Sequence, residues 1–258
     1  MNFTGAELSA WLASVMWPFM RIGAMFAAAP ILSARSVPIR IRILLTMIIA
    51  WILVPVIPPP PAVDLISAEA VLISIYQVVI GVAMGFILQM VFAAFIIAGQ
   101  SIAMAMGLGF ASMVDPQNGV QVPVVSQAFL IMATLVFLAL NGHLVLIEVL
   151  ANSFQQMPVG LFAPSLDSLW QLVIWGSTMF AGGVLLALPA IAALLLVNLA
   201  FGVTARAAPQ LNIFAVGFPV MILIGMSFII LILPTITEHL TDLLVKAFAL
   251  IQTLLSGV

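Results

Sequence analysis

The sequence predicts an all-α membrane protein, because it is too apolar and too poor in charge for a water-soluble domain. Hydrophobic residues make up 65% of the 258 positions, charged residues only 5%, and the mean hydropathy is +1.37. Residues 70–114, 168–205 and 207–237 contain no charged side chain, and each stretch is longer than the roughly 20 residues that cross a bilayer. We therefore expect about six long hydrophobic helices, arranged in hairpins within one compact membrane unit.

Prolines, glycines and charges mark the ends of these helices. Three arginines separate the first helix from the second, and the run Pro58 to Pro61 ends the second, because consecutive prolines do not continue a helix. The expected helices lie at about residues 7–32, 39–57, 68–106, 124–140, 169–201 and 213–233, with a polar-interrupted segment at about 141–167 and a final amphipathic stretch at about 238–255.

The cations predict the orientation of the chain in the membrane. Arg35, Arg40 and Arg42 share the short connection between the first two helices, which the positive-inside rule places in the cytoplasm. Counting about six crossings brings Arg206 to the same side and places the proline run, the 141–167 region and the amino terminus outside.

An irregular glycine-rich connector, residues 107–123, separates the third helix from the fourth. Its glycines and prolines oppose a regular helix, whereas Phe110, Met113 and Val114 are too apolar for a freely solvated loop. Irregular backbone at membrane depth persists where it is buried in protein or lines a wet cavity. We therefore expect the connector to fold into a lumen, with an ordinary turn packed on helix ends as the alternative.

The third helix carries polar and thioether side chains toward this connector. Met104 and Met106 are candidates for flexible pore-side residues, although methionine is also common filler in apolar helices. Gln89 and Gln100 are spaced by about three helical turns and so share one face. That face looks either into a channel or toward hydrogen bonds across a helix interface.

Arg21 is the costliest single charge, because it lies inside the apolar stretch of the first helix. Either it faces the bundle interior and has a function, or its long side chain snorkels to the membrane interface. On the third helix, Gly81 and Gly85 form a small-xxx-small pair that permits close approach of another helix, and packing is the default interpretation.

Enzyme chemistry finds no support in the sequence. His143 and His239 do not form an H-E-x-x-H zinc pattern, and the chain lacks a dinucleotide fingerprint, a serine elbow and a phosphate loop. There is no cysteine for a thiolate metal site, and a net charge of −2 gives no reason to expect nucleic acid. We therefore expect no catalytic residue, no cofactor and no metal. The apolar composition predicts that membrane lipid surrounds the protein.

Two stretches carry a more specific signal than hydropathy. Residues 110–117 read Phe-Ala-Ser-Met-Val-Asp-Pro-Gln, and residues 205–219 begin Ala-Arg-Ala-Ala-Pro-Gln-Leu-Asn. Near the amino end, Met25 and Phe26 precede Pro30. On these residues the chain resembles, over essentially its whole length, the FliR family of flagellar type III export-gate proteins, which is related to the SctT proteins of injectisomes.

The resemblance implies a place in a larger assembly. One copy would join several copies of FliP and several copies of FliQ in a helically arranged channel at the flagellar basal body, in the bacterial inner membrane. Unfolded flagellar subunits would be the exported substrates. Residues 1–140 would pack like a FliP subunit, and residues 141–258 would contain a FliQ-like helix pair that approaches FlhB on the cytoplasmic side. Much of this assembly would rise above the bilayer, so that some of the six helices would not be true spans.

The resemblance also assigns roles to residues. The connector would be the plug of the closed pore, with glycines that let it swing aside and bulky apolar side chains that exclude water and ions. The residues carried over to this plug are Gly107, Gly109, Phe110, Met113, Asp115, Pro116 and Gly119. Between the last two helices, a cytoplasmic loop would contact a neighbouring subunit through Arg206, Pro209, Gln210 and Asn212.

Two other function classes stay open on the sequence alone. A small-molecule secondary transporter would show internal repeats and midplane ligands on broken helices, and no matching pair of interrupted segments bearing acids occurs here. A structural scaffold without a pore is the third class. Shortening the glycine-rich connector distinguishes the scaffold from the channel.

Overall fold

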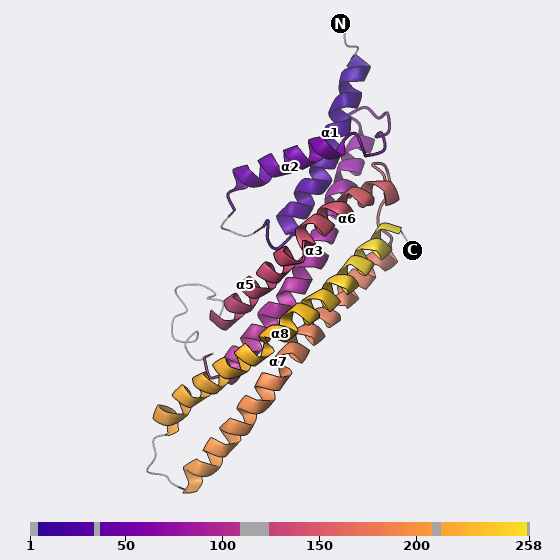
Figure 1. Cartoon of the computed structure of the whole chain (residues 1–258). Coiled ribbons are helices and arrows are strands. Elements are labelled where there is room, and N and C mark those ends of the chain that lie inside the picture. The colour runs from indigo at the N-terminus through magenta and orange to yellow at the C-terminus, as the bar shows by residue number, and fades with distance from the viewer. Residues whose placement is uncertain (1–4, 34–36, 109–123, 208–212, 257–258) are drawn as a thin grey trace. The chain divides into compact units, whose positions relative to one another are not determined.

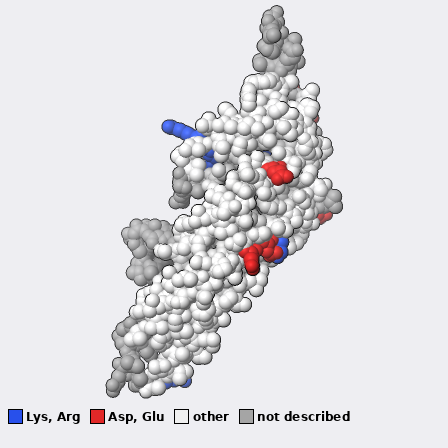
Figure 2. All heavy atoms as spheres, viewed as in Figure 1, with Lys and Arg blue, Asp and Glu red and all other residues white. Residues whose placement is uncertain are grey.

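The computed structural model describes residues 5–33, 37–108, 124–207 and 213–256 (Figure 1). Within these ranges the chain is all-α and contains no strand. The helices are α1 (Gly5–Ala28), α2 (Ile39–Leu53), α3 (Ala68–Ala105), α5 (Val124–Ala139), α6 (Gly142–Gln156), α7 (Leu166–Ala207) and α8 (Ile213–Ser256). Charged side chains are few on the face drawn in Figure 2, as expected for a membrane protein.

The expected count of about six spans is wrong for the described part of the chain. Four helices, α1, α3, α7 and α8, are long and apolar enough to cross a membrane, and the broken pair α5 and α6 would add a fifth. With 15 residues, α2 extends only about 22 Å, less than the roughly 30 Å of the hydrocarbon core. The number of crossings therefore no longer fixes the side of Arg206, and its cytoplasmic placement depends on the positive-inside rule alone.

The expected break between residues 233 and 238 is also absent, because α8 runs unbroken from Ile213 to Ser256. Pro234 removes one backbone donor, which membrane helices tolerate where neighbouring groups compensate. Beyond it, Ile236, Leu240 and Leu243 continue the buried face at helical spacing and hold the chain in the same helix. The polar-interrupted segment contains a helix of its own, α6. The residue before it, Asn141, has the left-handed backbone conformation, with φ 56°.

The chain divides into two compact units, and α3, α7 and α8 contribute residues to both. Unit 1 comprises Met1–Met90, Leu140–Trp175 and Leu244–Val258, and unit 2 comprises Val91–Ala139 and Gly176–Leu243. Serine hydroxyls begin two of the long helices: Ser67 accepts the Ala70 N–H at 3.1 Å before α3, and Ser165 accepts the Ser168 N–H at 3.1 Å before α7.

In unit 1, α1 and α3 pack as parallel neighbours. Trp17 Nε1 on α1 donates to Ser74 Oγ on α3 at 3.2 Å, and contacts further along α1 meet later residues of α3. Because parallel neighbours require the chain to return between them, the segment that contains α2 and the run Pro58 to Pro61 carries it back to the start of α3.

In unit 2, glycines bring helices close to α3. A Cβ added at Gly99 would lie 2.6 Å from Ser126 Cα on α5, and one added at Gly183 on α7 would lie 2.7 Å from Ala94 O on α3. Phe92 on α3 and Phe137 on α5 add an edge-to-face contact, with ring centroids 5.6 Å apart. Backbone proximity and a buried aromatic pair thus form the core of this unit.

Candidate functional site

Arg21 is fully buried in unit 1 and joins three helices. From α1, its Nε donates to Gln77 Oε1 on α3 at 2.8 Å. Its Nη1 donates to Ser153 O at 2.9 Å and to Ser153 Oγ at 3.2 Å, and its Nη2 donates to Met157 O at 2.8 Å. The planar guanidinium of Arg21 thus connects α1 and the first third of α3 with the carboxyl end of α6.

The end of α6 supplies the negative field that a buried cation needs. Met157 is the residue that caps α6, and its carbonyl lies beyond the helical hydrogen bonds. Ser153 O already accepts the Met157 N–H at 3.0 Å and shares its second lone pair with Arg21. Cations are stabilised at helix carboxyl ends by the helix dipole. The Phe154 ring, with its centroid 4.2 Å from Arg21 Cζ, adds a cation–π contact.

The snorkelling alternative for Arg21 is therefore wrong, since the side chain is 0% exposed and points into the bundle. None of the carboxylates in the described ranges contacts it, so oriented dipoles balance its charge instead of an ion pair. One donor in this cluster, Gln77 Nε2, is buried without a partner among the described residues.

The glycine pair of α3 lies against the turn of α1 that contains Arg21 and the turn that follows it. A Cβ added at Gly81 would lie 2.2 Å from Arg21 O, and one added at Gly85 would lie 2.6 Å from Met25 O. Packing is thus confirmed as the role of this small-xxx-small pair, and its partner is α1. Because the glycines let the backbones touch, the Arg21 side chain reaches Gln77 one turn away on α3.

Of the expected plug residues, the structure describes only Gly107, and it shows a local role for it. Gly107 has φ 81°, its N–H donates to Met104 O at 3.0 Å, and the Leu108 N–H donates to Ala103 O at 3.0 Å. These are the two hydrogen bonds of a Schellman motif, which ends α3. Six expected plug residues lie outside the described ranges: Gly109, Phe110, Met113, Asp115, Pro116 and Gly119.

The two methionines at the end of α3 differ in their surroundings. Met106 is buried inside unit 2, where a Cβ added at Gly225 of α8 would lie 2.5 Å from its Cγ. Met104 is 63% exposed, so of the two only Met104 presents its side chain at the surface of the chain. Gln89 and Gln100 are also exposed on α3.

Arg206 is exposed in the last turn of α7, as a loop contact requires. Pro209, Gln210 and Asn212, its expected companions, lie outside the described ranges.

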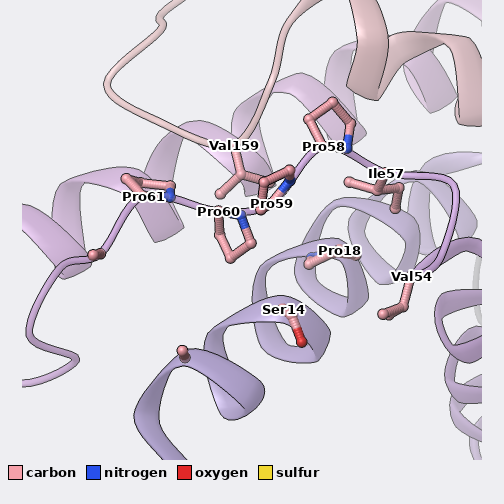
Figure 3. Close-up of a pocket in the computed structure, with 11 residues that line it drawn as sticks. Ser14, Pro18, Val54, Ile57, Pro58, Pro59, Pro60, Pro61 and Val159 are labelled. Carbon is pink, nitrogen blue, oxygen red and sulfur yellow. The ribbon is translucent and has the colours of Figure 1, made fainter. Parts of the chain in front are cut away.

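Unit 1 also contains an apolar cavity of about 320 Å³ between α1 and the proline run (Figure 3). Pro18 interrupts the hydrogen bonds of α1, so the Ser14 carbonyl lacks its usual helical donor, and both residues line the cavity. The remaining walls are aliphatic or proline side chains, with no titratable group among the lining residues. Across the described ranges, no group of three or more His, Cys, Asp or Glu side chains is placed to hold a metal ion.

Comparison with known proteins identifies the family. A sequence model described as "Bacterial export proteins, family 1" matches residues 12–247. The chain belongs to this family. Among curated members named "Flagellar biosynthetic protein FliR", the Escherichia coli (strain K12) protein is 38% identical over 256 residues, which covers 99% of this chain and 98% of the relative.

More distant FliR relatives share the same name. The Bacillus subtilis (strain 168) protein is 36% identical over 217 residues, covering 83% of each chain, and the Aquifex aeolicus (strain VF5) protein is 32% identical over 232 residues, covering 90% of each. The resemblance drawn from residues 110–117 and 205–219 is confirmed at the level of the family. This FliR-type export protein is thus a membrane protein of flagellar biosynthesis.

Proposed function

We propose that this chain is a subunit of the flagellar type III export gate in the bacterial inner membrane, and that it forms, with FliP and FliQ, the channel for unfolded flagellar proteins. Nearly full-length similarity to proteins named for flagellar biosynthesis, within a family of bacterial export proteins, is the observation that carries the proposal. Deletion of the gene is expected to abolish secretion of flagellar subunits and to spare secretion by other routes. Normal flagellar secretion in the deletion strain would contradict the proposal.

The exposed surface supports a subunit of an assembly. Only 22% of the most apolar 18-residue window of α7, and of that of α8, is buried within the chain, so most of these two windows is available to lipid and neighbouring subunits. We propose that FliP, FliQ and FlhB cover part of this surface, with residues 1–140 in a FliP-like and residues 141–258 in a FliQ-like role. Native mass spectrometry of the purified complex tests this composition, and a complex without FliP or FliQ would contradict it.

We further propose that residues 107–123 plug the resting channel. The support is compositional: apolar side chains such as Phe110 and Met113 on a glycine-rich segment, directly after Met104 on α3. Removing residues 110–118 is expected to leave the assembly intact and to make the resting membrane leak ions. Gly107 is retained, because it ends α3.

Membrane conductance and dye uptake measure this leak. A second variant replaces residues 110–118 with a glycine–serine segment of equal length. This variant keeps the reach of the loop and removes only the apolar side chains. Both variants should leak if the apolar side chains form the seal. A variant that assembles fully and shows wild-type conductance would rule out the plug.

For Arg206 we propose a cytoplasmic contact with a neighbouring subunit, made together with Pro209, Gln210 and Asn212. Its support is an exposed guanidinium at the end of α7. Arg206→Ala is expected to abolish motility, because a bidentate donor is lost, and Arg206→Lys should restore it only in part. Swimming in soft agar measures the effect. If the alanine variant swims and crosslinks to its neighbours as the wild type does, Arg206 is only part of a solvated turn.

A further inference from the structure

In unit 2, the middle of α7 is firmly held by two other helices. Gly183 packs against Ala94 O of α3, where an added Cβ would lie at 2.7 Å. From α8, His239 Nε2 lies 2.9 Å from Gly182 O, which accepts the ring N–H in the tautomer that carries it. The Phe95 ring of α3 meets the His239 ring edge-to-face, with centroids 6.4 Å apart. These contacts fix α7 at Gly182 and Gly183, which we call the stem.

The helix weakens two turns beyond the stem. Pro189 lies inside α7 and has no N–H, so the Leu185 carbonyl loses its helical donor. Leu185 and Pro189 both line a cleft of about 390 Å³ between α7 and α8, together with Phe228, Thr235 and His239. The weakened turn therefore borders empty space into which the helix can bend.

From Leu195 onward, α7 loses its support within the chain. Ala190 and Leu194 are still 0% exposed, but no residue from 195 to 207 is buried. Leu196 and Leu199 are 68% and 65% exposed. A segment with so few buried contacts has little to hold it in one position.

The opposite helix is better anchored at the same level. Gly225 of α8 packs on Met106 of α3, and Met106 is 1% exposed. In Figure 1, α7 and α8 run antiparallel from either side of residues 208–212. Movement of the α7 segment would therefore be movement relative to both α3 and α8.

We propose that Pro189 is a hinge on which residues 190–207, the arm, move relative to the stem. The stem supplies the fixed side, the proline supplies the broken backbone hydrogen bond, and the cleft supplies the room. The arm carries Arg206 at its end, so bending at Pro189 displaces the exposed cation that marks the connection to α8.

Distance measurements between two spin labels test the hinge. The chain has no native cysteine, so Val203→Cys on the arm and Leu223→Cys on α8 give one defined pair of exposed sites. The full-length chain with both cysteines is co-expressed with the other export components, extracted in native-membrane nanodiscs and then spin-labelled. The cysteine-free chain, carried through the same labelling, gives the background.

Pro189→Ala is the decisive variant. Alanine restores the N–H that Leu185 O lacks, so the distance distribution is expected to narrow by about twofold or more relative to the chain with Pro189. Pro18→Ala is the matched control, because it makes the same chemical change inside α1, in unit 1, away from both labels, and it should leave the width unchanged. An equal width with Pro189 and with alanine at this position, or an equal narrowing in the Pro18→Ala chain, would overturn the hinge.

Discussion

Arg21→Ala is expected to destabilise unit 1 by about 3 kcal/mol or more, the largest effect of any single substitution considered. The change removes four hydrogen bonds and the cation–π contact, and it leaves a cavity where α1, α3 and α6 meet. It also leaves Met157 O and the Gln77 amide buried without their partner. Loss of this variant from the membrane fraction should accompany a loss of motility.

A buried cysteine measures the loss of stability directly. Ala50 of α2 is 0% exposed, and the chain has no other cysteine, so the rate of thiol labelling at Ala50→Cys reports opening of unit 1. Arg40→Ala, which removes an exposed arginine, is the control and should label at the wild-type rate. Equal labelling rates for the Arg21 and Arg40 variants would contradict a structural role for the buried cluster.

A double substitution separates lost partners from lost charge. Arg21→Met fills most of the space and leaves the Gln77 amide unpaired, whereas Arg21→Met with Gln77→Leu removes both polar groups. The double variant is expected to be more stable than Arg21→Met alone, because replacing both partners by apolar groups removes the unsatisfied amide. If Gln77→Leu lowers the stability of the Arg21→Met chain further, the unpaired Gln77 amide is not the reason why loss of Arg21 destabilises unit 1.

Gly81→Ala is expected to have the second largest effect, about 2–3 kcal/mol. The added methyl group would overlap Arg21 O, closer than a carbon and an oxygen that are not bonded can approach, so α1 and α3 must separate. Separation of the helices also pulls the Arg21 side chain away from Gln77. The glycine contact and the hydrogen bonds of Arg21 are therefore coupled. The same Ala50→Cys labelling assay measures the result.

Glycines on α7 provide the comparison. Nothing lies within 4 Å of a Cβ added at Gly176 or at Gly202. Alanine at either position should be neutral or stabilising by about 0.5–1 kcal/mol, since it only restricts the unfolded chain and favours the helix. If Ala50→Cys is labelled as slowly in the Gly81→Ala chain as in the Gly176→Ala and Gly202→Ala chains, the packing of α1 on α3 does not depend on contact between their backbones.

Hydropathy was sufficient to predict the fold class and the existence of most helices, because long charge-free stretches have few other solutions in a membrane. It did not separate spans from short helices: α2 is as apolar as its neighbours and yet has only 15 residues. Nor did it predict the continuity of α8, because the effect of Pro234 depends on whether later residues remain buried against other helices.

The local sequence also signalled Arg21 and the glycine pair, but it did not reveal what they contact. Arg21 was conspicuous as a lone charge, and Gly81 with Gly85 as a helix-contact motif. The partners of Arg21 at the end of α6, Ser153 and Met157, are more than 130 positions away from it and accept through carbonyl groups, which every residue has. Only the packing of α6 against α1 selects those two carbonyls, and no pattern along the chain encodes it.

Crosslinking to a protein in transit tests the export role most directly. A photoreactive amino acid is placed at Met104 or Phe110 while a flagellar subunit fused to a tightly folded domain is stalled during export, with exposed Leu196 on α7 as the comparison position. The proposed channel predicts adducts with the stalled subunit from Met104 and Phe110 and none from Leu196. The opposite result is that, while the subunit is shown to be stalled, Met104 and Phe110 form adducts only with lipid or resident subunits. That result would contradict a passage lined by this chain.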